Sequence, residues 1–215
     1  HRAGDPFLFV ERGNDHRHRH SGDDNRVNCY VLIGGASSRM GRSKVDLPFG
    51  GSTFLERIIA AVRPVFDDVI AVQRAGGAAA SALRTIYEPP HELQAPVFGL
   101  WTALEDAAAR CFVLAIDYPL ITSEVLRYLS SAASASAAAM VVPQWNGKLQ
   151  MLCAGYSPAI LPQFAPRVAA GRLNLRGLTE DIEIIPENDL RERFAGEPLM
   201  NVNSPGELRE AERFV

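Results

Sequence analysis

The sequence has little cysteine and no long apolar run. Its three cysteines among 215 residues, Cys29, Cys111 and Cys153, are widely spaced and form no Cys-x-x-Cys pair, so we expect reduced, buried residues rather than disulfides or a zinc site. No apolar stretch approaches the roughly 20 residues that span a bilayer, and the first residues lack the order of a secretory signal. The sequence therefore predicts a soluble, cytoplasmic protein with no membrane partner.

The chain also lacks an excess of basic residues. Its 22 Lys and Arg residues are balanced by 25 Asp and Glu residues, which gives a formal net charge of −3. Proteins that bind the nucleic-acid backbone usually carry a basic surface, so nucleic acid is not an expected partner. At this length, with 47% hydrophobic residues, the chain can close one substantial core but hardly two.

The first 26 residues differ in composition from the rest of the chain. They are polar and hold four of the five histidines. His16, His18 and His20 alternate, and such a pattern can bind a transition metal, but alternating histidines in a polar tail are more often solvated. We expect residues 1–26 to be a disordered extension and residues 27–215 to form a single domain.

From Val27 onward, apolar runs alternate with helical patterns, which favours an α/β fold with helices on both faces of a mainly parallel sheet. Asn146-Gly147 is a strong hairpin signal, so at least one strand is expected to run antiparallel. The expected strands are 27–33, 68–73, 84–87, 111–116, 140–144, 149–156 and 182–185. The expected helices are 53–63, with a Thr53/Glu56 capping box, 99–110, and three that begin near Thr122, Ser157 and Ser204.

A glycine pair, Gly34-Gly35, follows the first buried strand directly, within LIGGASSRMGRSK. Glycines leave backbone amides open to a ligand where the chain turns out of the sheet, and Arg39 and Lys44 add two cations beside that turn. The segment matches neither the P-loop nor the Gly-x-Gly-x-x-Gly fingerprint. It predicts an anion site; the alternative is a glycine-rich connection with two surface cations.

Asp117 stands at the end of the apolar strand 111–116. Ligands bind at the carboxyl ends of parallel strands, where an acidic residue can hold Mg²⁺ against phosphate oxygens. The alternative is an aspartate that caps the helix beginning near Thr122. Together with the expected anion site at the end of the first strand, Asp117 favours the metal role.

These segments resemble a known family. Residues 32–47, LIGGASSRMGRSKVDL, resemble the Leu-x-Gly-Gly-x-Ser-x-Arg-Met-Gly-x-x-Lys-x-x-Leu signature of the molybdenum cofactor guanylyltransferase family. Residues 95–99 resemble its Gly-Pro-Leu-Ala-Gly motif, residues 115–119 its Asp-x-Pro strand end, and residues 200–208 its Asn-x-Asn-Thr-Pro-x-x-Leu tail. The resemblance runs from about Val27 to the end of the chain.

The resemblance implies a Rossmann-like nucleotidyltransferase fold, a three-layer sandwich, that transfers GMP from GTP to molybdopterin and releases pyrophosphate with Mg²⁺. The implied partners are these two substrates and a molybdoenzyme or cofactor-delivery protein. The resemblance assigns Arg39, Lys44 and Asp117 to catalysis, Asp117 to the metal, Leu32, Ile33, Gly34, Gly35, Lys44, Glu88 and Asp117 to the nucleotide, and Asn201 and Asn203 to the vicinity of the metal and pterin.

Some positions depart from the family pattern. Glu88 stands where the family usually has Asp, and Ala95 and Phe98 replace the smaller Gly and Ala, so the loop near the sugar or base is expected to be bulkier. This leaves three alternatives open: CTP on the same pterin, a nucleoside triphosphate on a sugar phosphate, or a carrier without turnover. Cytidylyl relatives usually have Ala-Gly where this chain has Gly34-Gly35, which favours guanine.

Two further residues have structural interpretations. His91 lies in a proline-rich loop and is expected to stabilise that loop or lie at the surface rather than act as a base. Trp101 is expected in the core rather than as a stacking platform for a base.

Overall fold

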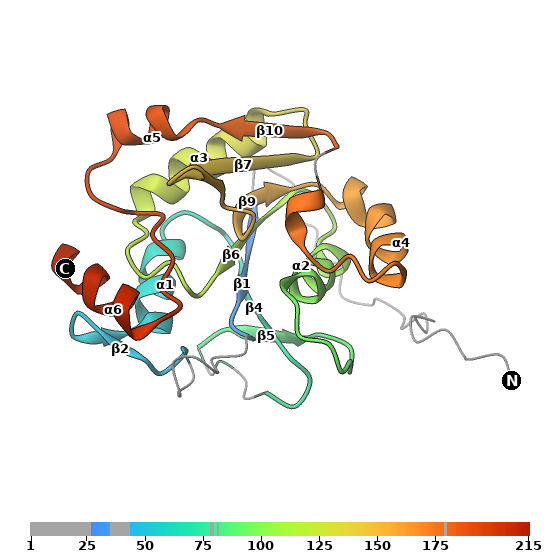
Figure 1. Ribbon diagram of the computed structural model, residues 1–215, viewed down its shortest axis with the longest axis horizontal. Coiled ribbons are helices and arrows are strands. Elements are labelled where there is room, and N and C mark those ends of the chain that lie inside the picture. Colours follow the sequence, from blue (N-terminus) through green and yellow to red (C-terminus); the bar gives the residue numbers. More distant parts are fainter. Residues whose placement is uncertain (1–26, 35–43, 78–79, 81, 179) are drawn as a thin grey trace, which may run out of the picture.

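The computed structural model describes residues 27–34, 44–77, 80, 82–178 and 180–215 (Figure 1). The expected N-terminal extension, residues 1–26, lies outside the described residues. So do Gly35 and Arg39, and their assigned roles stay predictions.

A mixed sheet of eight strands forms the centre of the molecule. Its order is β10-β7-β9-β6-β1-β4-β5, and β8 pairs with β7 beside this path. β9 runs antiparallel to its neighbours β6 and β7, whereas the other pairs along the path are parallel. This confirms the expected mainly parallel sheet. The strands are β1 (Asn28–Leu32), β4 (Val69–Gln73), β5 (Arg84–Tyr87), β6 (Cys111–Ala115), β7 (Met140–Trp145), β8 (Lys148–Leu149), β9 (Cys153–Tyr156) and β10 (Ile182–Ile185).

The hairpin expected at Asn146-Gly147 is present, with φ angles of 49° and 69° at the two residues. The returning strand expected over 149–156 is wrong, because the chain forms two short strands, β8 and β9, with a turn between them. Gln150 causes the break: its backbone N–H donates to the carbonyl of Pro143 and its own carbonyl accepts from Cys153 N–H. The strand therefore ends at Leu149 and β9 starts afresh between β7 and β6.

Helix α1 (Phe54–Val62) begins as expected, because Thr53 and Glu56 form a reciprocal capping box. Helix α2 (Pro96–Asp106) differs from the expected span 99–110. It starts earlier because Pro96 suits the first helical turn, where its missing N–H leaves no bond unmade. It ends earlier because Ala107 is already extended, leading the chain to β6.

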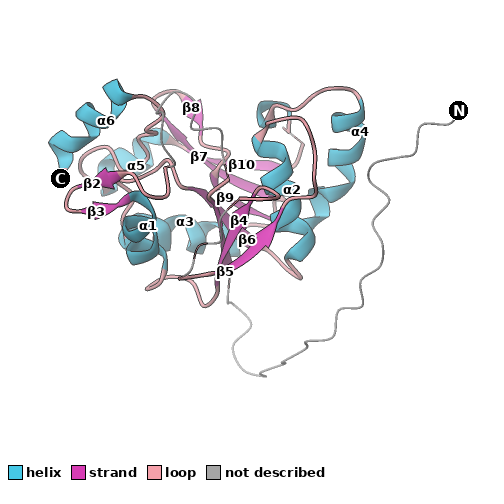
Figure 2. Ribbon diagram, turned by 90° about the horizontal axis from the view of Figure 1, so that it is seen from below, coloured by secondary structure: helices cyan, strands magenta, loops and turns pink. Residues whose placement is uncertain are grey.

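Helices cover both faces of the sheet (Figure 2). One face carries α1, α3, α5 and α6, and the other carries α2 and α4. Alternate residues of β1 belong to the two hydrophobic cores. Cys29 and Val31 pack in the core on the face of α1 and α3, whereas Tyr30 and Leu32 pack in the core on the face of α2 and α4. This is the predicted three-layer sandwich. The remaining elements are β2 (Pro48–Phe49), β3 (Ser52–Thr53), α3 (Ser123–Ala135), α4 (Phe164–Ala169), α5 (Glu187–Arg193), α6 (Pro205–Ala211) and the 3₁₀ turns η1 (Pro158–Gln163), η2 (Leu175–Gly177) and η3 (Glu212–Phe214).

The three cysteines are buried and free, as expected. Trp101 lies in the core on α2, also as expected. None of the helices in the described part of the chain is long and apolar enough to cross a membrane.

Candidate active site

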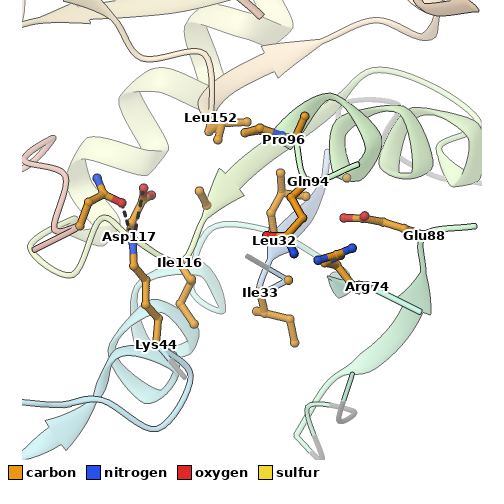
Figure 3. A pocket seen from close by; sticks show the side chains of 15 residues that line it. Leu32, Ile33, Lys44, Arg74, Glu88, Gln94, Pro96, Ile116, Asp117 and Leu152 are labelled. Atoms are coloured by element: carbon orange, nitrogen blue, oxygen red, sulfur yellow. Dashed lines mark hydrogen bonds and ion pairs between the residues drawn. The ribbon is translucent and has the colours of Figure 1, made fainter. Parts of the chain in front are cut away.

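The carboxyl ends of four neighbouring parallel strands, β5, β4, β1 and β6, meet at one edge of the sheet. A cavity of about 290 Å³ opens there (Figure 3). Such an edge is where open α/β sheets bind ligands, because the connecting loops diverge and leave a crevice. Of the residues assigned from the sequence, those that line the cavity are Leu32, Ile33, Gly34, Lys44, Glu88, Asp117 and Asn203.

Three of these side chains form a polar cluster at one end of the cavity. Lys44 Nζ donates a hydrogen bond to Asn203 Oδ1 at 2.6 Å and lies 3.9 Å from Asp117 Oδ2. Only 15% of the Lys44 side chain and 18% of the Asp117 side chain are exposed. The C-terminal tail is held beside the end of β6 by its backbone, because Val202 N–H donates to the Asp117 carbonyl at 2.8 Å.

The two charges in this cluster stand in a poorly solvated place. Burial raises the pKa of the Asp117 carboxyl, and the Lys44 ammonium opposes that rise only in part. Burial likewise lowers the pKa of Lys44, against the attraction of Asp117 and Glu207. A further cation bound at Asp117 would favour its ionised form, and an anion at Lys44 would favour the ammonium. The cluster is therefore suited to a ligand that carries both charges, such as a metal-bound phosphate.

The aspartate fits a divalent cation. Asp117 Oδ1 is buried and has no hydrogen-bond partner within the described part of the chain. Mg²⁺ is commonly held by one or two carboxylates together with substrate phosphates and water. Among the described residues, no group of three or more His, Cys, Asp or Glu is placed to hold a metal, so a cation at Asp117 would take its remaining ligands from a bound phosphate and water. Thr122, not Asp117, caps α3, and the alternative of a capping aspartate is wrong.

Gly34 forms part of the wall where the chain leaves β1. A Cβ on Gly34 would stand 2.7 Å from the backbone nitrogen of Arg74 and 2.8 Å from Gln73 Oε1. Any larger residue would therefore push the ends of β1 and β4 apart. Leu32, Ile33 and Ile116 add apolar walls between the polar groups at the two ends (Figure 3).

Glu88 lies at the other end of the cavity, after β5. Its backbone N–H donates to the Gln73 carbonyl at 2.8 Å, which places it beside the end of β4. Two residues that were not assigned from the sequence, Arg74 and Gln94, also line the cavity, and Arg74 lies beside Glu88 (Figure 3). Arg74 directly follows β4, and the rule that ligands bind at strand ends would have found it. Nothing in the local pattern around Gln94 singles it out.

Asn201 lies next to the site but not in the cavity wall. Its Nδ2 donates to Gln150 Oε1 at 2.9 Å, and the hydroxyl of Tyr118 donates to the same oxygen at 3.1 Å. Gln150 Nε2 in turn donates to the carbonyls of Trp145 and Lys148. Gln150 is thus a buried polar hub between the β7–β8 hairpin and the tail. The sequence pattern placed Gln150 inside the expected strand 149–156 and did not predict this role.

The sheet order, and a cavity at the carboxyl ends of its parallel strands with Lys44 and Asp117 in its wall, are typical of an α/β protein that binds a nucleotide. The family model for the MobA-like NTP transferase domain matches residues 29–183. The chain belongs to this family, as the sequence motifs predict.

Individual relatives agree with this assignment. The chain is 30% identical over 195 residues to the probable molybdenum cofactor guanylyltransferase of Carboxydothermus hydrogenoformans. The alignment covers 84% of this chain and 92% of the relative. Among solved structures, molybdopterin-guanine dinucleotide biosynthesis protein A from Archaeoglobus fulgidus superposes with a TM-score of 0.75 at 21% identity, covering 87% of this chain and 98% of that one. A 2-C-methyl-D-erythritol 4-phosphate cytidylyltransferase from Thermus thermophilus shares the fold, with a TM-score of 0.65 at 16% identity over 88% of this chain and 98% of that one.

Proposed function

We propose that the protein transfers GMP from GTP to the phosphate of Mo-molybdopterin, forming molybdopterin guanine dinucleotide and releasing pyrophosphate. The observation that carries the proposal is the juxtaposition of Lys44, Asp117 and Asn203 at the strand edge. The names of the family and of its relatives supply the choice of pterin and guanine. The proposal retains the cytoplasmic location and the single domain over residues 27–215 expected from the sequence.

Charge is the main obstacle to this reaction. A triphosphate carries about four negative charges near neutral pH, and attack by a second phosphate brings two anions together. Lys44 lies at the polar end of the cavity, where its ammonium can bind phosphate oxygens and stabilise the charge that develops in the transition state. Arg39, from the predicted anion loop, is proposed to add a second positive charge to the same phosphates.

Asp117, with its unpartnered Oδ1, is proposed to hold Mg²⁺ together with phosphate oxygens. The metal supplies charge neutralisation and polarises the phosphoryl group. The protein contributes position: Val202 N–H fixes the Asp117 backbone, and Asn203 fixes the Lys44 ammonium. No covalent enzyme intermediate is needed, because in-line displacement depends mainly on orientation and charge.

The rest of the cavity is proposed to hold the nucleoside. Leu32, Ile33, Gly34 and Gly35 would lie along the base and ribose, and Glu88 would contact the nucleoside at the far end. Asn201 and Asn203 would face the pterin substrate. A Cβ on Gly34 would meet Arg74 N at 2.7 Å, so glycine is required where the chain leaves β1 beside this part of the cavity.

The test measures pyrophosphate release with Mg²⁺, Mo-molybdopterin and each of GTP, CTP, ATP and UTP, and identifies the dinucleotide product by mass. Release with GTP alone supports the proposal. Release with CTP alone assigns a cytidylyltransferase, and nucleotide binding without release with any of the four assigns a carrier. The Lys44→Met variant is the negative control, since it keeps the side-chain length without the charge.

A further inference from the structure

A histidine outside the proposed chemistry contacts the nucleoside end of the cavity. His91 Nε2 lies 2.9 Å from Glu88 Oε2, and the two side chains are 13% and 6% exposed. Glu88 lines the cavity and His91 lies behind it in the loop that joins β5 to α2. The pair is therefore largely removed from water, and the placement of its protons follows from the hydrogen bonds around it.

The contact of the second ring nitrogen, Nδ1, shows which ring nitrogen of His91 carries a proton. His91 Nδ1 lies 2.5 Å from the carbonyl oxygen of Leu93, which can only accept, so Nδ1 carries a proton. At Nε2 the ring then either donates to the Glu88 carboxylate as an imidazolium or accepts from a protonated Glu88. In both cases a hydrogen bond joins the two side chains and fixes the direction of the Glu88 carboxyl group. A bare carboxylate facing a bare ring nitrogen would have no such bond.

The imidazole ring of His91 also packs against an aromatic ring. The Phe98 ring stacks on the imidazole with a centroid distance of 3.9 Å and an interplanar angle of 27°. Phe98 was expected to make the cavity loop bulkier; instead the wall is formed by Ala95, Pro96 and Gly99, and Phe98 is buried under His91. Stacking and the bond to Leu93 together leave the imidazole one orientation, with Nε2 toward Glu88.

This arrangement uses one carboxylate oxygen of Glu88 and leaves the other for a ligand. The contact with His91 is made by Oε2, and the other oxygen, Oε1, lies where a Cβ on Gly99 would stand only 3.1 Å away. Oε1 thus lies over the start of α2, in space that exists because residue 99 is glycine. The Glu88 carboxylate points into the cavity (Figure 3).

We propose that His91 is a positioning residue for nucleotide binding: it holds Glu88 Oε2 so that Oε1 accepts a hydrogen bond from an N–H or O–H group of the nucleoside. The inference rests on the proposed function, because it requires a nucleotide in this cavity. Arg74 also lines the cavity beside Glu88 and brings a positive charge to this end (Figure 3).

Two variants separate positioning from loop structure. The amide of His91→Gln places its N–H₂ near the position of Nε2 and keeps the donor to Glu88, whereas His91→Asn places it near Nδ1 and keeps only the bond to Leu93. We expect His91→Asn to raise the KM for GTP and the Kd of the GTP–Mg²⁺ complex about tenfold, the loss expected for one charge-assisted hydrogen bond, with kcat unchanged. We expect His91→Gln to restore both constants close to those of the unchanged protein. Glu92→Gln, an exposed neighbour in the same loop, is the matched control.

Nucleotide analogues identify the donor that Glu88 Oε1 meets. 2′-Deoxy-GTP lacks one ribose hydroxyl, and ITP lacks the exocyclic amine of guanine. The effect of His91→Asn disappears with the analogue that lacks the contacted group, because the interaction is then already lost. An effect of equal size on GTP, 2′-deoxy-GTP and ITP contradicts an Oε1 contact to either group.

Nitrogen-15 NMR observes the protons on the His91 ring directly. In the full chain labelled with ¹⁵N-histidine, the signal that His91→Gln removes is expected to show a protonated Nδ1. An unprotonated Nδ1, or equal GTP binding by the Asn and Gln variants, overturns the inference while leaving the proposed function intact. Failure of the unchanged protein to bind any nucleotide overturns the proposed function itself.

Discussion

The Lys44 ammonium donates a hydrogen bond of 2.6 Å to the side-chain oxygen of Asn203, which lies 159 positions later in the chain. This bond joins the segment after β1 to the C-terminal tail across the end of β6. The tail is fixed in turn by the start of α6, because Glu207 accepts a hydrogen bond from Asn203 N–H and donates its own N–H to Ser204 Oγ. The cation of the site is therefore oriented by a helix cap.

Replacing Lys44 with methionine is expected to lower kcat by about 10² to 10³, since one donor to the transition-state charge is lost. The lowered pKa of Lys44 also predicts that activity declines on the alkaline side at a lower pH than an ordinary lysine would give. Pyrophosphate release measured across pH checks both points. Lys148→Met, at an exposed lysine outside the cavity, is the control and should keep the rate of the unchanged protein.

Asp117→Asn is expected to abolish metal-dependent turnover, with a loss above about 10³, yet to raise the Tm of the ligand-free protein. The pKa of Asp117 is raised in the folded state, so its contribution to stability is complete below the unfolded pKa and is lost as pH rises through the folded pKa. At neutral pH the buried carboxylate opposes folding, and the neutral amide does not.

Thermal unfolding with and without GTP and Mg²⁺ tests this prediction. The unchanged protein should gain stability from GTP and Mg²⁺ together, whereas Asp117→Asn should gain less. Asp68→Asn, at an exposed aspartate, is the control and should respond like the unchanged protein. A lower Tm for Asp117→Asn in the absence of ligand would contradict the expectation, drawn from the raised pKa, that the buried carboxylate opposes folding at neutral pH.

Gly34→Ala is expected to destabilise the protein by about 1–3 kcal/mol and to weaken GTP binding, because the new Cβ would stand 2.7 Å from the Arg74 backbone nitrogen, which can give way only if the chain after β4 shifts. Chemical denaturation and nucleotide titration measure the two effects. Gly206→Ala is the matched control: its nearest neighbour would be 3.8 Å away, and alanine favours the helix. Equal stability of the two variants would contradict the claim that a Cβ at residue 34 is crowded by the chain after β4.

Gln150→Leu is expected to cost about 2–4 kcal/mol, since it leaves two donors and two carbonyls without their shared partner. Tyr118→Phe removes one of these bonds and should cost about 1 kcal/mol. We also expect Gln150→Leu to raise the KM for the pterin more than that for GTP, because Asn201 loses its anchor. A larger effect on the GTP constant would place Asn201 on the nucleotide side instead.

The sequence predicts those structural features that depend on a few neighbouring residues. The Thr53 and Ser204 caps involve side chains and N–H groups three positions apart, and both helices begin as the sequence predicts. The Asn146-Gly147 turn is equally local, since these residues tolerate positive φ. The break at Gln150 was missed, because it depends on backbone and side-chain bonds to β7, which alternation of polar and apolar residues does not reveal.

Short-range periodicity and residue chemistry were enough to predict the alternation of strands and helices and the places of Gly34, Lys44 and Asp117 near strand ends. They could not predict that Asn203 orients Lys44, that Arg74 joins the cavity or that Phe98 supports His91, because these contacts join distant parts of the chain. The physical reason is strand order: residues far apart in the chain become neighbours only once β5, β4, β1 and β6 pair side by side and their loops converge at one edge.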